Sequence, residues 1–367
     1  MIFCIYGTTA EVIKLAPVLA RLQQRGERFV GLCTGQHVET IPPLLDQLGL
    51  PQPDIWLGRG NKGRDLSLSR QVPSWSLQVA VRFVAQYRSL RRMMKRSTAS
   101  NLLLIHGDTF TTILGALMGR ALRIPVGHIE AGVRSFTLRH PFPEELIRRV
   151  TSRLARLHFA PGDIATSNLA NVAGTAVNTR MNTVQDSLEM VPEVVDHRLP
   201  PLPPHFGIVS LHRFELIGDR KLLGRILRLL SDHASEIPLL FVDHPITVAK
   251  IEQYGLGSLF DDKNFIRIPK LSYFAFVTLV KKCEFAVTDS GGLQQESYCL
   301  DLPCLVHRAA VETFDGVGKN VVVSGLDVAV VEEFLSDPGR YRSGARPEGP
   351  SPSDIIIEHL SREGFIS

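Results

Sequence analysis

The sequence lacks a cysteine pattern that would define a disulfide framework or a zinc site. Its five cysteines, at positions 4, 33, 283, 299 and 304, are scattered along the 367 residues, and none forms a Cys-x-x-Cys pair. Such frameworks and sites are recognised by closely spaced or regularly paired cysteines. We therefore expect neither, and we expect a reducing cytoplasmic setting.

Long apolar runs and a concentrated basic stripe are also missing. No apolar stretch reaches the roughly 18 residues typical of a membrane span, and the opening MIFCIYGTTAEVIKLAPV has no basic or long apolar region of a signal peptide. The formal net charge is only +4. The densest basic run, residues 91–96, contains apolar residues and is typical of the solvated end of a helix. We expect no membrane span and no nucleic-acid partner.

An alternation of short apolar runs with helix-period stretches fills most of the chain. It starts at MIFCIYG and restarts after the proline-rich HRLPPLPPHF. This pattern predicts an α/β fold of parallel sheets covered on both faces, and the length favours two domains. We predict two doubly wound, Rossmann-like lobes facing a cleft. The N-terminal lobe is expected at 1–166, with a C-terminal helix at 354–367 packing back on it, and a nucleotide-binding lobe at 167–353.

Polar residues follow the predicted strands at several equivalent places. Ligands of doubly wound sheets bind beyond the carboxyl ends of the strands, so these residues predict a ligand-binding edge. They are Gly7-Thr8, Thr34 to His37, His106 to Asp108, His128 to Glu130, His212-Arg213 and Asp289 to Gly292.

Three carboxylates and one histidine at these places could carry acid/base chemistry. Taken alone, Asp108 is better explained by capping of the following helix, by Asp108 itself or by Thr109, and Glu144 is sufficiently explained by the positive N-terminal end of a helix. Glu130 stands on an otherwise apolar strand, where a carboxylate is costly to bury without a partner. His212 could transfer a proton or bind a phosphate. Together they indicate general acid/base catalysis.

A metal site is the alternative use of the polar residues around Asp108 and Glu130. His106 and His128 would complete a set of metal-ligand types, but no two of the four have a recognised ligand spacing. We therefore expect no metal and no redox cofactor.

The segment TDSGGLQQES, residues 288–297, combines a strand end, a two-glycine turn and a predicted helix start. The Ser290 hydroxyl and the amides of Gly291 and Gly292 at a helix N-terminus would suit a diphosphate. Glu296, one turn further, could accept hydrogen bonds from a ribose. A plain strand-to-helix turn is the structural alternative.

Motifs from residue 1 to about residue 320 resemble, in order, those of the UDP-N-acetylglucosamine 2-epimerase family. They are GTTAEVIKLAPV, TGQH, HGDTFTT, IPVGHIEAGVRS, PFPEELIRRV, NTVQDSL, SLHRFE, TDSGGLQQES and LDLPCLVHR. The resemblance implies a glycosyltransferase-B-like fold, a homodimer and catalysis without a cofactor. It implies catalytic roles for Asp108, Glu130, Glu144 and His212. It also implies that a nucleotide sugar is bound by Lys14, Phe276, Ser290, Gly291, Gly292 and Glu296.

The family chemistry implied by this resemblance is removal of the sugar C2 proton with departure of UDP, followed by re-addition of UDP to a glycal-type intermediate. The substrate would be UDP-GlcNAc or a modified UDP-HexNAc. Addition of water instead would give a hydrolysing 2-epimerase. A glycosyltransferase of the same fold would not need all three carboxylates, and a non-catalytic binding protein would need none.

The sequence also departs from the family pattern at several positions. The resemblance leads us to expect arginine where Thr9 and Thr313 stand, a basic residue at Val38 and a glycine at Met181, and the closing motif has become ARPEGPS. Arginine binds phosphate in a bidentate manner. We therefore expect weaker binding of ordinary UDP-sugars or a different donor, and loss of activation by substrate.

Overall fold

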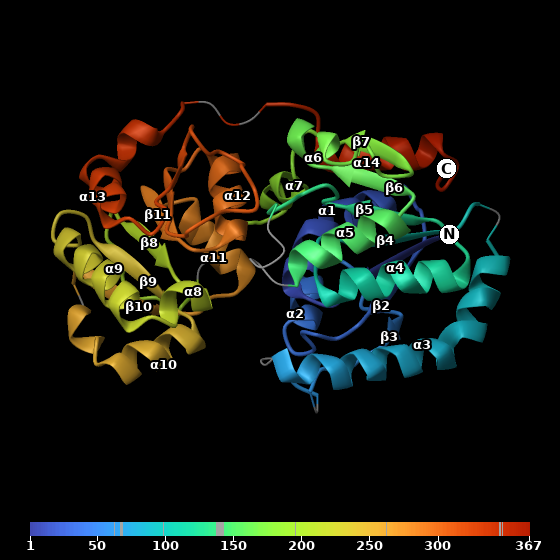
Figure 1. The fold of residues 1–367 in the computed structure, drawn as a ribbon, viewed down its shortest axis with the longest axis horizontal. Helices are drawn as coiled ribbons and strands as arrows, with labels where there is room; N and C mark the ends of the chain where they lie inside the picture. Colours follow the sequence, from blue (N-terminus) through green and yellow to red (C-terminus); the bar gives the residue numbers. More distant parts are fainter. Residues whose placement is uncertain are drawn as a thin grey trace. The chain divides into compact units, whose positions relative to one another are not determined.

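The chain folds into two compact α/β units. The computed structural model describes residues 1–61, 63–66, 69–97, 99–136, 143–194, 196–261, 263–344, 346 and 348–367. The first unit comprises Met1–Met190 and Gly349–Ser367, and the second comprises Val191–Glu348 (Figure 1). The prediction of two doubly wound units is confirmed.

The first unit contains a seven-stranded parallel sheet with the order β3-β2-β1-β4-β5-β6-β7. Every residue of β1 and β4 is buried, which is why their sequences read as unbroken apolar runs. The strands are β1 (Ile2–Tyr6), β2 (Phe29–Cys33), β3 (Ile55–Trp56), β4 (Leu102–His106), β5 (Val126–Ile129), β6 (Leu157–Ala160) and β7 (Thr175–Asn178).

Helices cover this sheet through amphipathic faces. The longest, α3 (Val72–Lys95), buries Trp75, Val79 and Phe83 and carries the basic run at its C-terminal end, as predicted. The other helices of the unit are α1 (Thr9–Gln24), α2 (Ile41–Gln47), α4 (Phe110–Leu122), α5 (Glu144–Leu154), α6 (Asp163–Ser167), α7 (Val184–Glu189) and α14 (Pro352–Arg362).

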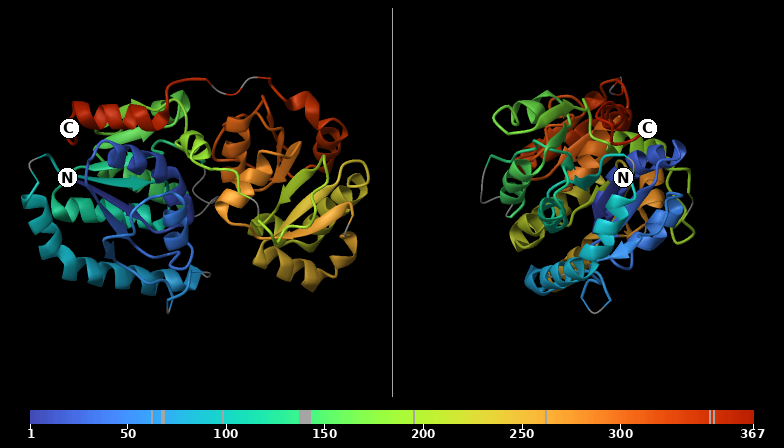
Figure 2. Two further views of the ribbon diagram at one scale, coloured as in Figure 1. Left: turned by 180° about the vertical axis from the view of Figure 1, so that it is seen from behind. Right: turned by 90° about the vertical axis from the view of Figure 1, so that its right-hand side faces the viewer.

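The end of the first unit differs from the boundary expected at 166/167. Strand β7 pairs with β6, and α7 packs on α1, so residues 167–190 belong to the first unit. Helix α14 also packs on α1, as predicted for the C-terminal helix, and is seen beside the first unit in both views of Figure 2. Ala345 and Pro347 of the divergent closing motif lie outside the described residues.

The second unit contains a six-stranded parallel sheet with the order β10-β9-β8-β11-β12-β13. Its strands are β8 (Gly207–Ser210), β9 (Leu239–Asp243), β10 (Phe265–Pro269), β11 (Phe285–Thr288), β12 (Cys304–Val306) and β13 (Val321–Val323). Apolar clusters cover both faces of the sheet. The helices are α8 (Phe214–Ile217), α9 (Arg220–His233), α10 (Pro245–Tyr254), α11 (Tyr273–Val280), α12 (Gly291–Leu300) and α13 (Val328–Ser336).

Both sheets reverse their strand order at one point, between β1 and β4 in the first unit and between β8 and β11 in the second. Such a switch point is where doubly wound sheets bind ligands. Within each unit, the predicted polar residues lie at the carboxyl ends of these strands and their neighbours. Among the described residues, no helix is both long and apolar enough to cross a membrane.

Candidate active site

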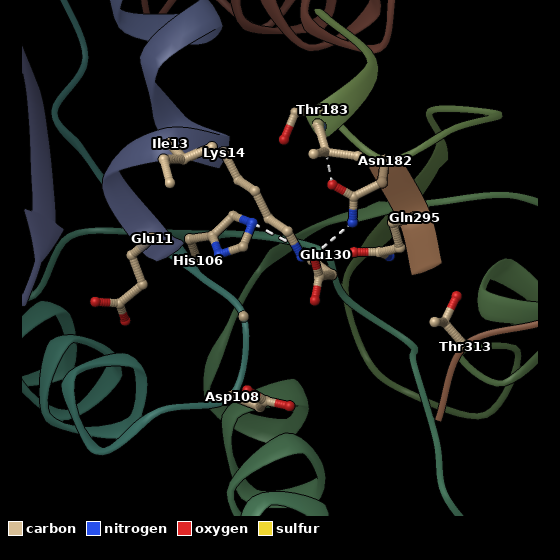
Figure 3. Close-up of polar contacts among 12 residues, drawn as sticks. Glu11, Ile13, Lys14, His106, Asp108, Glu130, Asn182, Thr183, Gln295 and Thr313 are labelled. Carbon is tan, nitrogen blue, oxygen red and sulfur yellow. Dashed lines mark hydrogen bonds and ion pairs between the residues drawn. The ribbon is translucent and has the colours of Figure 1, made fainter. Parts of the chain in front are cut away.

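Glu130 is the centre of a polar cluster at the edge of the first sheet, in which His106 and Asn182 are buried and Glu130 and Lys14 are partly exposed (Figure 3). Its Oε2 accepts hydrogen bonds from Lys14 Nζ and Asn182 Nδ2, both at 2.5 Å, and lies 3.5 Å from His106 Nε2. Glu130 directly follows β5 and has a φ of 66°, a left-handed conformation that costs a non-glycine residue about 1–2 kcal/mol. Strain of this kind is concentrated at functional sites. The cluster also uses Lys14, which the family resemblance had placed near a diphosphate.

The partners of Glu130 decide its protonation state. Burial opposes ionisation, but the charge of Lys14, then His106, and the hydrogen bonds from Lys14 and Asn182 outweigh it and lower the pKa of Glu130 to about 2. Burial lowers the pKa of His106 to about 4 and that of His128 to about 3. At neutral pH the cluster therefore holds an ionised carboxylate beside neutral imidazoles.

The buried His128 gives a pH-dependent prediction. Its Nε2 lies 2.7 Å from the carbonyl oxygen of Gly107, and its side chain is fully buried. The folded chain keeps this imidazole neutral while the unfolded chain protonates it near pH 6.5, so its contribution to stability is lost as pH falls below that value. We expect His128→Gln to gain stability relative to wild type by up to about 1.4 kcal/mol per pH unit between pH 6.5 and 4.

Urea unfolding of both proteins at several pH values measures this difference. Because other titrating groups are common to both proteins, their contributions cancel. A difference in unfolding free energy that does not change with pH would contradict a neutral His128.

Asp108 lies at the end of β4 and is paired with Arg148 of α5. Arg148 also lies 3.8 Å from Glu145, whose other oxygen accepts a 2.7 Å hydrogen bond from Arg149. Glu145 and Arg149 are thus an i,i+4 ion pair on α5. Glu144 is the first residue of α5 and is partly buried, and Pro141 and Phe142 of its motif lie outside the described residues. Asp108 therefore forms an ion pair with Arg148, a partner that was not predicted from the sequence.

The turn at Ser290 has the geometry of an anion site. Ser290 caps α12 through its side chain, and Gly291 and Gly292 form the first two positions of the helix. A Cβ on Gly292 would meet nothing nearer than the Ser290 Oγ at 3.6 Å, and one on Gly291 nothing nearer than Glu312 at 4.0 Å. Neither glycine is required by the packing of the chain itself. The space above these amides is what close approach of a phosphate needs.

Asp289 organises the other side of this turn. It is fully buried, and its carboxylate accepts backbone hydrogen bonds from His212 at 2.8 Å and Arg213 at 2.7 Å. The His212 ring lies beside that of His244, with 4.5 Å between their centres, and His244 Nε2 lies 3.0 Å from Ser210 Oγ. Burial, followed by the charges of Arg213 and Lys270, lowers the pKa of His212 to about 4. The imidazole of His212 at this edge of the second sheet is therefore neutral at neutral pH.

Arg308 is a basic residue of this region that sequence reasoning missed. It follows β12, is 7% exposed, and donates a 2.9 Å hydrogen bond to Glu312. Its Nε is buried and makes no hydrogen bond, although Glu215 Oε2 lies 3.9 Å away. The charge of Arg308 also reaches Asp289, whose pKa it helps to lower against the dominant effect of burial. The signal available in the sequence was an arginine directly after the buried strand LPCLVH.

The two remaining predicted nucleotide contacts lie on α11 and α12. Glu296 is buried. Burial of Tyr273, followed by the charge of Glu296, raises the pKa of Tyr273 well above its usual value. Phe276 is partly buried and packs against the apolar cluster on one face of the second sheet. Glu296 and the Ser290 turn therefore belong to the same helix, as predicted.

Threonines at the two positions where the resemblance leads us to expect arginine are held by local contacts. The Thr9 amide donates to His37 Nδ1 at 3.1 Å. Thr313 Oγ1 donates to Asp315 Oδ2 at 2.6 Å, and Gln295 Nε2 donates to the same oxygen at 3.0 Å. Each threonine thus fixes a loop. In the second unit, the positive charges near Asp289 come instead from Arg213 and Arg308.

These features define a class of protein: a two-unit α/β protein with a carboxylate–lysine–histidine cluster at the edge of one sheet and a glycine-led helix start at the edge of the other. Among the described residues, no three His, Cys, Asp or Glu side chains gather as a metal ion would require.

Comparison with known proteins identifies the family. The model of the family "UDP-N-acetylglucosamine 2-epimerase" matches residues 20–336. A probable UDP-N-acetylglucosamine 2-epimerase of Ralstonia nicotianae is 32% identical, over 98% of this chain and 97% of that protein. The crystal structure of Neisseria meningitidis UDP-GlcNAc 2-epimerase bound to UDP-GlcNAc has a TM-score of 0.81 at 27% identity, covering 98% of this chain and 99% of that one.

A second solved structure gives the same result. The S. aureus protein MnaA in complex with UDP has a TM-score of 0.80 at 28% identity, covering 100% of this chain and 97% of that one. The chain belongs to the UDP-N-acetylglucosamine 2-epimerase family and is an epimerase, hence an isomerase, with a glycosyltransferase-B-like fold. The family and fold predicted from the sequence are confirmed.

Proposed function

We propose that this protein is a nucleotide-sugar 2-epimerase acting on UDP-GlcNAc or a modified UDP-HexNAc. The observation that carries the proposal is the Glu130 cluster, an ionised carboxylate fixed by Lys14 and Asn182 at the switch-point edge of the first sheet. Family membership supports the nature of the substrate. Asp108 and Glu144 supply two further carboxylates from the same unit.

In the proposed reaction a carboxylate of the first unit takes the proton from sugar C2. The electrons of the C2–H bond form a C1–C2 double bond as the C1–O bond breaks and UDP leaves with its electron pair. Re-addition of UDP at C1 and protonation of C2 on the opposite face complete the epimerisation. The sugar C2 proton is weakly acidic, so the reaction needs both a placed base and stabilisation of the leaving diphosphate.

The second unit would bind the nucleotide in this proposal. The Ser290 turn supplies backbone donors at a helix N-terminus, and Arg308 supplies a buried guanidinium beside it. His212, kept neutral, would donate a hydrogen bond to the departing phosphate. Glu296 would accept hydrogen bonds from the ribose.

Deuterium exchange tests the proposed function. The protein is incubated with UDP-GlcNAc in deuterated water, and the sugar C2 position is followed by NMR. We expect deuterium at C2 and formation of the C2 epimer with UDP attached. Free sugar and UDP as products would instead identify a hydrolysing 2-epimerase. Absence of exchange with UDP-GlcNAc and with a panel of UDP-HexNAc donors would rule out epimerase chemistry.

We further propose that the protein is a homodimer that pairs through α3. Leu77, Val81 and Val84 are 67%, 60% and 72% exposed and lie at helical spacing on one face of this helix. The C-terminal half of α3 is basic, and the helix has no acidic residue. In an antiparallel, two-fold pairing the apolar segments would meet while the basic halves would lie apart.

A substitution at the centre of this face tests the dimer. We expect Val81→Glu to weaken dimerisation by about 100-fold, because it would bury a charge in the interface. Light scattering after size-exclusion chromatography measures the mass. The control is Gln86→Glu, at an exposed position elsewhere on the same helix, and it should remain dimeric. A wild-type monomer, or a Val81→Glu dimer as stable as wild type, would contradict this interface.

A further inference from the structure

Glu11 is a buried carboxylate that the proposed chemistry does not use. It lies in the first turn of α1 and is 2% exposed. Its Oε2 accepts hydrogen bonds from the Gly7 amide at 2.7 Å, the Thr8 amide at 2.9 Å and the Thr8 hydroxyl at 3.1 Å. The Thr8 amide contact, together with the 3.3 Å hydrogen bond that the Glu11 amide donates to Thr8 Oγ1, forms a capping box at the start of α1, and the other two contacts close the same turn. None of these contacts involves the other carboxylate oxygen of Glu11, Oε1.

The second oxygen of Glu11 reaches a different turn. Oε1 accepts a 2.6 Å hydrogen bond from the hydroxyl of Thr109, which is 98 positions away in the sequence and directly follows Asp108. Thr109 Oγ1 is also the N-cap of α4, accepting from the amides of Thr111 at 3.0 Å and Thr112 at 3.4 Å. Because the cap uses the lone pairs of the hydroxyl, its proton is available for Glu11, and Glu11 must be the acceptor.

The surroundings of this contact leave little room for adjustment. A Cβ on Gly7 would lie 2.0 Å from Thr34 Oγ1 and 2.3 Å from Thr111 Oγ1. The turn at Gly7 therefore packs against Thr34 and Thr111 with no room for a side chain. Thr111 Oγ1 is 2.7 Å from Thr34 Oγ1, and Thr112 Oγ1 donates to the His106 carbonyl at 2.6 Å. All three hydroxyls of the TFTT segment therefore anchor the start of α4.

The same helix carries a catalytic contact one turn further on. Lys14, three residues after Glu11 in α1, reaches Glu130. Glu11 thus connects the turn that follows Asp108 with the helix whose Lys14 holds Glu130. Figure 3 shows Glu11 and Lys14 on this helix.

We propose that Glu11 is a positioning residue that fixes Asp108 relative to Glu130 by accepting the Thr109 hydroxyl. This inference rests on the proposed epimerase function. Displacement of a catalytic group by about 1 Å can cost about 100-fold in rate. Loss of the Glu11–Thr109 contact should therefore lower turnover while leaving nucleotide binding by the second unit unchanged.

Variants on both sides of the contact test this role. We expect Glu11→Gln and Thr109→Val to lower kcat for C2 exchange by about 10- to 100-fold, with the affinity for UDP unchanged. Thr109→Ser keeps the hydroxyl and should retain kcat within about twofold, since only a methyl group is lost. The double variant Glu11→Gln/Thr109→Val should be no slower than the slower single variant, because one shared contact is removed. Burial raises the pKa of Glu11 to about 7, so assays at pH 8 keep it ionised.

The control is Glu27→Gln, which changes the same charge just beyond the far end of α1 and should leave kcat unchanged. Hydrogen exchange of the amides of residues 109–112 provides a readout that is independent of catalysis. Faster exchange in Glu11→Gln but not in Glu27→Gln supports the positioning role even if wild type shows no epimerase activity. Wild-type kcat in Thr109→Val, or unchanged amide exchange in Glu11→Gln, would overturn it.

Discussion

Glu130→Gln is expected to lower C2 deuterium exchange by about 10²–10⁴-fold, the range that acid/base groups contribute. The substitution removes the charge that balances Lys14 and the acceptor that both Lys14 and Asn182 share. The amide oxygen of glutamine could still accept from both donors, but it carries no charge to balance Lys14 and no site basic enough to take a proton. The Glu130 cluster would then lose its basicity.

The measurement is the NMR exchange assay, combined with calorimetric titration of UDP. We expect UDP affinity to be unchanged, because the structure engages Lys14 with Glu130 and the nucleotide contacts proposed above, the Ser290 turn, Arg308, His212 and Glu296, lie in the second unit. Unchanged UDP binding also shows that the second unit of the variant is folded, and a thermal melt reports on the first unit. Exchange at the wild-type rate in Glu130→Gln would remove this residue from the catalytic set.

Gly292→Asp is expected to stabilise the folded protein and to weaken its binding of UDP. Gly292 is exposed at the second position of α12, where an acidic side chain interacts favourably with the helix dipole. Replacing a glycine also reduces the entropy of the unfolded chain. We expect the free energy of unfolding without nucleotide to rise by about 0.5–1 kcal/mol. The same charge would repel the diphosphate and raise the Kd for UDP by about 100-fold, comparable to loss of a charged contact.

Gly292→Asn is the matched control, because it has nearly the same shape without the charge. Its UDP affinity should lie between those of wild type and Gly292→Asp, and the gap between the two variants should narrow at high salt. UDP binding by Gly292→Asp at the wild-type affinity would show that the diphosphate does not lie over this turn.

The architecture was predictable because buried parallel strands read as continuous apolar runs with polar residues at their ends. IFCIY and LLLIH show this in the first unit, and Asp289 to Gly292 follow such a strand in the second. Strand β7 was not recognised because its four residues are exposed or only partly buried and give no hydrophobic signal. The domain boundary was misplaced for the same reason.

The partners of the candidate site residues could not be predicted from the sequence. Lys14 and Glu130 are 116 positions apart, and Asn182 and Glu130 are 52 apart. Helix periodicity shows which face of α1 is buried, but it does not show which strand end that face meets. Motif resemblance therefore identified Glu130 and Asp108, whereas Asn182, Arg148 and Glu11 required the fold.

The packing of the C-terminal helix α14 on α1 affects when the first unit can finish folding during synthesis. Ser353 donates its amide to Asp186 of α7 at 2.8 Å, and Arg21 of α1 donates to Ser351 at 2.9 Å. On the ribosome, α1 and α7 are therefore synthesised long before their partner α14, and the whole second unit emerges between them. Domains generally fold as units during synthesis. We expect the first unit to remain open along α1 until α14 has been synthesised.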